Sequence, residues 1–182
     1  MPIYEFEGKR PVIGKRSFVH PQANIIGDVK LGPGCYVGAG ACIRGDWGSI
    51  VIGEKSNIQE NCVIHVGPEV CARMGNRSHI GHGAILHSPN LGEHVLVGMG
   101  AIIMDWSTIG DGCVIGAGAL VPERMEIPPF KLAVGMPAKI IADIDEKKRV
   151  QLEEGTGYYI GLPPRCHKSL REITLAEVLE QD

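Results

Sequence analysis

The stretch of sequence that decides the fold is residues 91–121, LGEHVLVGMGAIIMDWSTIGDGCVIGAGALV. An aliphatic residue recurs in it at every sixth position, and a glycine often follows directly. A period of six matches neither the 3.6-residue period of an α-helix nor the alternation of a strand in a plain hairpin. It is typical of a solenoid, in which each unit forms a short strand and a turn and neighbouring coils bury one another's faces.

The same repeat can be followed toward the N-terminus through most of the chain. Its aliphatic positions are Ile13, Val19, Ile25, Leu31, Val37, Ile43, Ile52, Ile58, Ile64, Met74, Ile80, Leu86, Leu91, Val97, Ile103, Ile109, Ile115 and Val121. The phase slips by three residues after Ile43, gains four around residues 68–73 and loses one near Pro89. Three units would close one triangular coil with the aliphatic side chains inside, and strands of successive coils would lie about 4.8 Å apart. The repeat therefore predicts an all-β fold, a left-handed parallel β-helix (a hexapeptide-repeat prism) over residues 1–125.

Residues 126–182 are expected to leave this prism. The prolines that indicate an extended crossing segment are Pro122, Pro128, Pro129 and Pro137, because each removes a backbone donor and fixes φ. Residues 144–154, IDEKKRVQLEE, then predict a C-terminal α-helix, with Asp143 as the N-cap and Gly155 just past its end. We expect this helix to pack along one face of the prism.

Composition and charge exclude several classes of protein. The formal net charge is -3, which gives no support to binding of nucleic acid or of a membrane surface. The chain has no apolar run of about 18 residues, and its first residues, MPIYEFEGKR, lack the apolar core of a signal peptide. The sequence therefore predicts a cytoplasmic protein. Its 6 cysteines include no Cys-x-x-Cys pair, so we expect small buried hydrophobic residues and no disulfide framework.

The repeat also predicts which polar side chains meet. Residues three units apart lie on the same face of successive coils, and the residue after each aliphatic position points outward. The count places Arg44, His65 and His87 in one outward column, with Asp46 near the same edge. Bringing two imidazoles together gains nothing without a cation between them. The column therefore predicts a metal site, in preference to two histidines that merely lie at the surface.

His82 belongs to the neighbouring repeat unit, on another side of the triangle, so it should not reach the other two histidines of its own chain. A second subunit could supply it, and threefold symmetry would then create three equivalent sites. Three imidazoles and one water form a common catalytic zinc shell. The remaining histidines have no such partners and are expected at the surface or in an interface: His20, His79, His94 and His167.

Five segments resemble the γ-class carbonic anhydrase family. They are RGDWGSIVIG (44–53), SNIQENCVIHV (56–66), HIGHGAILH (79–87), VGMGAIIMD (97–105) and AVGMPAKII (133–141). The resemblance implies a homotrimer with zinc, or alternatively iron or cobalt, at each subunit interface. It assigns the metal to His65 and His87 of one subunit and His82 of its neighbour.

The same resemblance assigns roles to further residues. Arg44 and Asp46 match a pair that joins subunits. Asn57 and Gln59 match an asparagine and the glutamine that orients metal-bound hydroxide, and Glu60 stands where a carboxylate follows. The implied activity is the reversible hydration of CO2, a small-molecule substrate, to bicarbonate. Either Glu60 or Glu69 would carry protons away.

Shorter segments are similar to a narrower group. MPIY, FVHP, GTGYY and RCHKSLREI resemble the hexapeptide-repeat proteins of phenylacetic acid degradation and carnitine metabolism. That likeness keeps an acyl-CoA thioesterase open as an alternative. A CoA-dependent acyltransferase is another, which would need one catalytic histidine and no metal. A catalytically silent assembly protein is a third.

Two departures from the carbonic anhydrase pattern weaken the expectation of fast CO2 hydration. The family's long acidic loop is replaced by the short segment 68–73, in which Glu69 is the only carboxylate. Trp47 stands where the family has an acidic residue beside the Arg/Asp pair. Trp106 is also unusual, because it falls in a turn where a small residue is usual.

Overall fold

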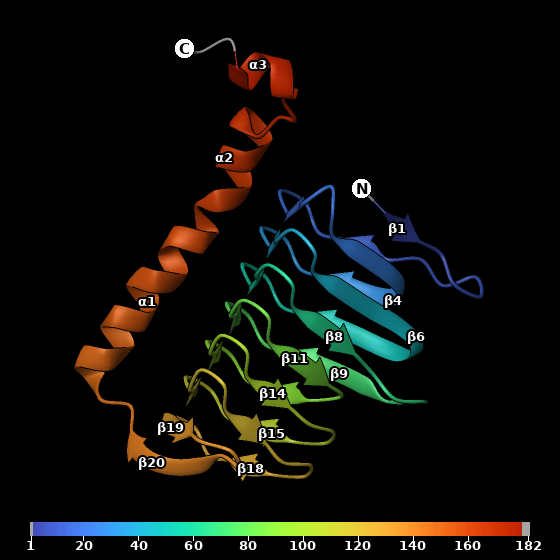
Figure 1. Ribbon diagram of the computed structural model, residues 1–182. Coiled ribbons are helices and arrows are strands. Elements are labelled where there is room, and N and C mark those ends of the chain that lie inside the picture. Colours follow the sequence, from blue (N-terminus) through green and yellow to red (C-terminus); the bar gives the residue numbers. More distant parts are fainter. Residues whose placement is uncertain (1, 180–182) are drawn as a thin grey trace.

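The computed structural model describes residues 2–179 and shows the left-handed parallel β-helix with a C-terminal helix that the sequence predicts (Figure 1). Its coils form a triangular prism with three faces. We name these the histidine face, which carries His65 and His87, the polar face, whose outward residues are mostly polar, and the helix-covered face, along which the C-terminal helix packs. The long strands β4 (Asn24–Leu31) and β6 (Cys42–Ile52) bend around the edge between the first two faces and belong to both.

The remaining strands each lie on one face. The histidine face adds β1 (Ile3–Tyr4), β8 (Val63–His65), β11 (Ile85–His87), β14 (Ile102–Ile103) and β17 (Leu120–Val121). The polar face adds β2 (Val12–Ile13), β9 (Cys71–Met74), β12 (Asn90–Leu91), β15 (Thr108–Ile109) and β18 (Glu126–Ile127). The helix-covered face consists of β3 (Phe18–Val19), β5 (Tyr36–Val37), β7 (Asn57–Ile58), β10 (His79–Ile80), β13 (Leu96–Val97), β16 (Val114–Ile115), β19 (Lys131–Val134) and β20 (Lys139–Asp143).

The aliphatic positions of the repeat form the core of the prism. On the histidine face Ile43 pairs with Ile64, Ile64 with Leu86, and Leu86 with Ile103 in parallel register. All four side chains are fully buried. Burial of such a side chain contributes about 1.5–3 kcal/mol, so a regular stack of them stabilises the prism along its whole length.

Glycines follow the core positions because successive coils approach closely there. A Cβ atom on Gly75 would lie 2.5 Å from the carbonyl carbon of Gly92, and one on Gly98 would lie 2.5 Å from the backbone nitrogen of Ala117. Any side chain at these positions would push the coils apart.

The solenoid runs further than residue 125. β18 and β19 continue the parallel pairing with β15 and β16. The reason is that Ile127 and Ala133 keep the six-residue spacing, while Pro128 and Pro129 fall in the turn between the two strands and remove no ladder hydrogen bond. Only β20 departs from the pattern, since it turns back and pairs antiparallel to β19.

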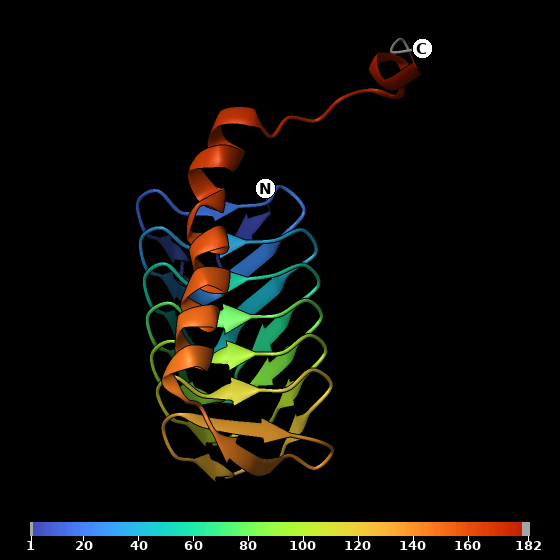
Figure 2. The same cartoon turned by 90° about the vertical axis from the view of Figure 1, so that its left-hand side faces the viewer.

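The C-terminal helix is longer than the sequence indicated. Helix α1 spans Glu146–Ile160, followed by α2 (Leu162–Ser169) and α3 (Leu175–Leu179). Its N-cap is Asp145 and not Asp143, because the Asp145 carboxylate accepts a hydrogen bond from the backbone N–H of Lys148, at 2.8 Å. Gly155 does not end the helix, because this stretch packs on the prism and buries the neighbouring Thr156. Figure 2 shows α1 running along the helix-covered face, as predicted.

The sequence predicts neither a membrane-spanning segment nor a disulfide framework. Among residues 2–179, no helix is both long enough and apolar enough to cross a membrane. All six cysteines are free, as predicted. The prediction that the cysteines are buried is confirmed for Cys35, Cys62 and Cys113 and is wrong for the other three, which are partly exposed.

Candidate metal centre

The predicted column of polar residues forms on the histidine face. Arg44 pairs with His65 and His65 with His87 in successive strands. Both histidines are the last residue of their strand, β8 and β11, so they lie where the histidine face meets the polar face. The Nδ1 atom of His65 lies 3.1 Å from the Nε2 atom of His87. The register count therefore identified two imidazoles that are in contact.

Each of these imidazoles has a carboxylate on its outer side. Asp46 Oδ1 lies 3.0 Å from His65 Nε2, and Asp105 Oδ1 lies 2.7 Å from His87 Nδ1. Arg44 in turn donates a 2.6 Å hydrogen bond to Asp46. Arg44 and Asp46 thus lie beside the pair, as the sequence predicted. Asp105 was not among the predicted residues, although it directly follows Met104, the residue that continues this column one coil beyond His87.

Both carboxylates are held in their charged form. Burial by itself would raise the pKa of Asp46, but the hydrogen bonds from Arg44 and His65 outweigh it and the pKa lies below its ordinary value. The pKa of Asp105 is lowered in the same way, by hydrogen bonds from His87 and Ser88 that outweigh burial. Two charged acceptors therefore face the outer nitrogens of the pair.

This arrangement fits a metal ion. A neutral imidazole carries one N–H, and the charged carboxylates place that hydrogen on His65 Nε2 and on His87 Nδ1. The two inner nitrogens then direct lone pairs toward one another across 3.1 Å, which a shared cation between them would stabilise. Histidine pairs oriented by outer carboxylates are common at zinc sites. Within residues 2–179, however, no three His, Cys, Asp or Glu side chains of the one chain form a metal-binding group.

His82 lies apart from the pair, as predicted. It precedes β11, whereas His87 ends that strand, so the two occupy opposite edges of the histidine face. Its Nδ1 atom lies 2.7 Å from Glu60 Oε2. Its backbone N–H donates to Gln59 Oε1 at 3.2 Å. Glu60 also accepts a hydrogen bond from the hydroxyl group of Tyr36, at 2.9 Å.

Gln59 and Asn57 support His82 from inside the fold. Both side chains are buried. The Gln59 amide nitrogen donates to Asn57 Oδ1 at 3.0 Å and lies 2.7 Å from His79 Nε2. Because its oxygen already accepts from His82, every polar group of Gln59 has a partner within its own chain. The structure therefore places Gln59 as a residue that positions the His82 backbone.

His79 corrects one sequence-based expectation. It was expected at the surface or in an interface without partners, but it is partly buried beside Gln59 and packs edge-on against Tyr159 of α1, with ring centroids 4.9 Å apart. Burial lowers the pKa of His79 to about 4. It is therefore neutral at pH 7 and can accept the hydrogen bond from Gln59.

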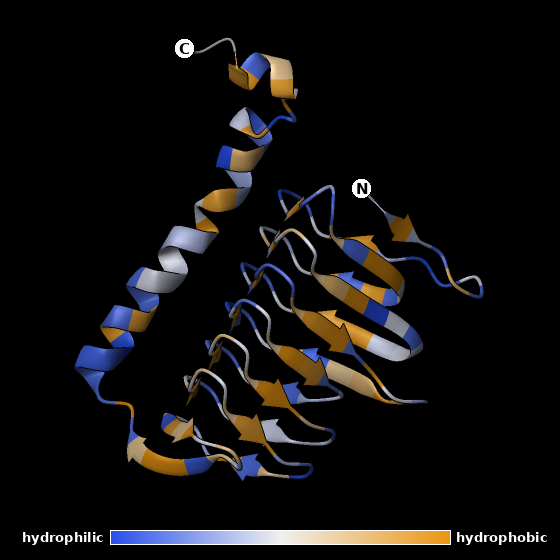
Figure 3. Ribbon diagram, viewed as in Figure 1, coloured by the Kyte–Doolittle hydropathy of each residue, from blue (hydrophilic) through white to orange (hydrophobic). Residues whose placement is uncertain are grey.

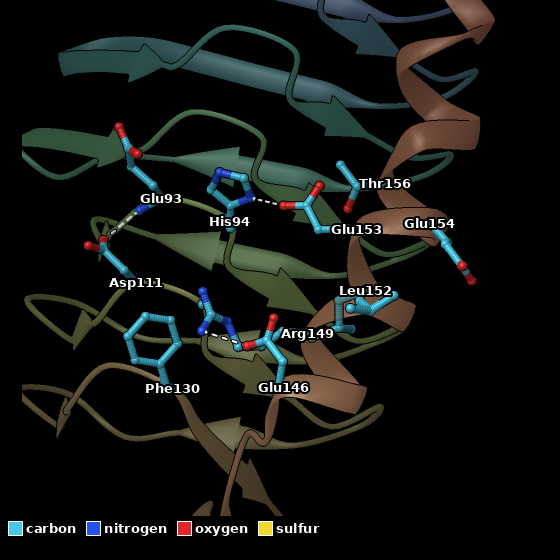
Figure 4. Close-up of a pocket in the computed structure, with 12 residues that line it drawn as sticks. Glu93, His94, Asp111, Phe130, Glu146, Arg149, Leu152, Glu153, Glu154 and Thr156 are labelled. Carbon is cyan, nitrogen blue, oxygen red and sulfur yellow. Dashed lines mark hydrogen bonds and ion pairs between the residues drawn. The ribbon is translucent and has the colours of Figure 1, made fainter.

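Two other histidines attach the C-terminal helices to the prism. His94 Nδ1 lies 2.7 Å from Glu153 of α1, and His167 Nε2 lies 3.1 Å from the carbonyl oxygen of Ser17. Figure 4 shows the His94–Glu153 pair beside a cavity of about 430 Å³ between α1 and the prism. These histidines are interface residues within the chain and have no part in the pair at the histidine face. His20 accepts a hydrogen bond from the backbone of Gln22.

Two tryptophans lie near the paired histidines. The exposed Trp47 has its ring centroid 5.6 Å from that of His65. Trp106 follows Asp105 directly and adopts a left-handed backbone with φ +54°, while the guanidinium group of Arg124 lies 4.4 Å above its ring. The cation–π contact with Arg124 holds Trp106 against the prism, in a turn where a small residue is usual.

The chain belongs to the hexapeptide-repeat family of proteins. The family described as bacterial transferase hexapeptide (six repeats) matches residues 10–45 and 88–123. Carnitine operon protein CaiE of Escherichia coli (strain K12) is 36% identical over 182 residues, which cover 100% of this chain and 93% of that protein. CaiE of Proteus sp. (strain LE138) is 37% identical and covers 96% of this chain and 88% of its own length.

Solved structures show the same fold. A putative acetyltransferase of Bacillus cereus has a TM-score of 0.87 and 35% identity, and the match covers 88% of this chain and 94% of that one. A hexapeptide transferase family protein from Anaplasma phagocytophilum has a TM-score of 0.85 and 33% identity, covering 90% and 96%.

Proposed function

We propose that this chain forms a homotrimer through its histidine face and binds one divalent metal ion at each interface. His65 and His87 of one copy would hold the metal together with His82 of the next copy. The observation that carries this proposal is the facing pair of imidazole nitrogens, 3.1 Å apart, with a charged carboxylate behind each ring.

The surface of the histidine face supports the assembly. Its outward residues form an apolar column in register: Val63, Ile85, Ile102 and Leu120. Val63 and Ile85 are 40% and 43% exposed in the single chain, although both are aliphatic. Neighbouring apolar side chains that remain exposed mark an interaction surface.

The proposed site has two half-sites, the His65–His87 pair and His82, and their placement supports a closed ring of three copies. The His65–His87 pair lies along one edge of the apolar column and His82 along the other. A contact between unlike edges of two copies is heterologous, and such contacts close into a ring when the rotation permits. Three triangular prisms would then bring each pair to the His82 of a neighbour and turn the apolar columns toward the common axis.

We propose that the reaction is the reversible hydration of CO2 to bicarbonate. Imidazole ligands suit zinc, and also iron or cobalt, and such an ion supplies a nucleophile at neutral pH by lowering the pKa of bound water. In this chain Asp46 and Asp105 would keep the two rings in the ligand tautomer, and Gln59 would hold the His82 backbone. Glu60 is partly exposed and contacts the His82 ring, so it would pass protons to solvent.

A second candidate is chemistry on an acyl thioester, either hydrolysis at the same metal or acyl transfer without one. A groove of about 420 Å³ lies beside His82, and CO2 does not need that space. Residues that line it include Gln59, His79, His82, Leu96, Met99 and Tyr159. The B. cereus structure is described as a putative acetyltransferase.

One set of assays separates these candidates. Purified protein is analysed for metal, stripped with a chelator and reloaded, and each form is tested for CO2 hydration by stopped flow and against a panel of acyl-CoA thioesters. We expect hydration that disappears on stripping and returns on reloading. Thioester hydrolysis with the same metal dependence, and no hydration of CO2, would mean that the substrate is a thioester and not CO2. Acetyl transfer that survives stripping in a protein without metal would contradict the metal-dependent proposal.

A further inference from the structure

The last described segment of the chain, residues 170–179, stands clear of the prism in both views (Figures 1 and 2). It follows α2, which contacts β3 near the N-terminal end of the prism. Its large apolar side chains are exposed: Leu170, Ile173, Leu175, Val178 and Leu179. Leu175 is 73% exposed. Because all five side chains are exposed, residues 170–179 form no hydrophobic core of their own.

The segment nevertheless carries a defined helix start. The backbone N–H of Thr174 donates to the Glu177 carboxylate at 2.8 Å, and the backbone N–H of Glu177 donates to Thr174 Oγ1 at 3.3 Å. This reciprocal pair is a capping box. A helix of five residues is too short to be stable in water without packing. The capped helix α3 therefore requires an apolar surface to pack on.

A matching surface exists at the N-terminal end of the prism, where no further coil covers the first strands. The exposed apolar residues there are Ile3, Tyr4, Phe6 and Val12. An uncovered end strand with apolar side chains invites pairing with other chains unless something covers it. α2 contacts this end at β3.

The charges of the two surfaces are opposite. Residues 2–16 contain four basic side chains and the two carboxylates Glu5 and Glu7, a net charge of +2, and Arg10 pairs with Glu5. Residues 170–182 contain four carboxylate side chains and one arginine. This complementarity favours contact between the tail and the N-terminal end.

We infer that residues 170–179 of each copy pack on the N-terminal end of a neighbouring copy, against Tyr4, Phe6 and Val12. The tail leaves its own prism at α2 and points away from it (Figure 2). Residues 170–174 reach at most about 17 Å when extended and the five-residue helix α3 adds about 7.5 Å. One side of the prism, set by six-residue units, measures about 20 Å. The tail is therefore long enough to reach the next copy. This inference rests on the proposed trimer but not on its metal.

The test uses full-length protein and measures cleavage by trypsin at Arg171, in the fraction that elutes as a trimer. We expect slow cleavage in the wild type. Cleavage should be at least tenfold faster in Val12→Ser, because that residue lies on the receiving surface, and also in Val178→Ser. The matched control is Ile141→Ser, an exposed aliphatic residue near the other end of the prism, and it should cleave like the wild type.

A second measurement identifies the receiving chain. The photo-crosslinking amino acid p-benzoylphenylalanine replaces Val178, so that the chain's own free cysteines are not labelled. This protein forms mixed trimers with isotope-labelled wild-type protein, and the crosslinked peptides are identified by mass spectrometry. Crosslinks to residues 3–13 of the other chain support the inference. Crosslinks within one chain, or a trimer whose tail is cleaved equally fast in all variants, would overturn it while leaving the trimer intact. A monomer would overturn the assembly itself.

Discussion

The histidine face and the polar face share one backbone geometry and one core, yet their outward columns differ. The histidine face presents Val63, Ile85, Ile102 and Leu120 in register, and Figure 3 shows its strands β8, β11 and β14 as strongly hydrophobic. The polar face presents Arg73, Asn90, Thr108 and Glu126 in register, all exposed. The inward residues therefore determine the fold, whereas the outward residues determine what each face contacts. The paired histidines lie at the edge of the face whose outward column is apolar.

The largest effect should come from placing a charge on the histidine face. Ile85→Lys would bring three ammonium groups together at the proposed axis, and burial of unpaired charges costs several kcal/mol each. We expect a monomer without metal, measured by light scattering and elemental analysis. Thr108→Lys places the same residue at the equivalent position of the polar face and should remain a metal-containing trimer. If both variants remain trimers, the difference between the faces has no bearing on assembly.

Removal of one proposed ligand should empty the site and leave the assembly intact. The variant is His82→Ala. His82 lies at the edge of the histidine face, is exposed in the single chain and contributes nothing to the core. We expect metal at background level, an unchanged trimer and a melting temperature close to that of the wild type protein without metal. His94→Ala is the control, because that histidine contacts α1. Full metal content in His82→Ala would exclude it as a ligand.

A smaller effect is expected from the carboxylate that the sequence analysis missed. Asp105→Asn removes the charge that holds His87 in its ligand tautomer, and loss of such a partner typically weakens metal binding about 10–100-fold. Competition with a chromogenic chelator measures this affinity. Asp111→Asn, in a turn distant from the pair, should bind metal like the wild type. Equal affinity in the two variants would mean that Asp105 does not orient the ring.

The smallest effect at neutral pH should come from the helix-covered face. The pKa of His79 is about 4 in the folded chain, against an ordinary value of 6.5. The unfolded chain therefore binds an extra proton between these values, and stability should fall as the pH drops through that interval. Between pH 7 and pH 5 the loss should be on the order of 2 kcal/mol. His79→Gln should lack this loss, which urea unfolding at both pH values at one protein concentration would measure. An equal loss in both proteins would assign it to other groups.

The parts of the molecule that could be predicted follow from the strict period of the repeat. Counting three repeat units at a time, with the insertions allowed for, places Arg44, His65 and His87 in one column whatever the other contacts are. The repeat did not predict Asp105, because its side chain reaches the column from a turn, where the repeat does not determine which way a side chain points. His79 was misplaced because its burial depends on Tyr159, which lies far along the sequence in a helix whose packing the repeat does not define.

The end of the prism was placed too early for a related reason. The prolines after Val121 favour an early end of the prism, although a proline removes a ladder hydrogen bond only within a strand. The aliphatic spacing through Ile127 and Ala133 was the better guide. In a solenoid the phase of the core residues therefore predicts the boundary more reliably than the residues in the turns.

The most direct test of the shared site is complementation between two inactive chains. His82→Ala and the double variant His65→Ala/His87→Ala should each bind no metal alone. When the two are co-expressed at equal levels, each interface has one chance in four of combining both intact half-sites, so the mixed protein should hold about a quarter of the wild-type metal. No metal in the mixed trimers, or full metal in either variant alone, would contradict a site built from two copies of the chain.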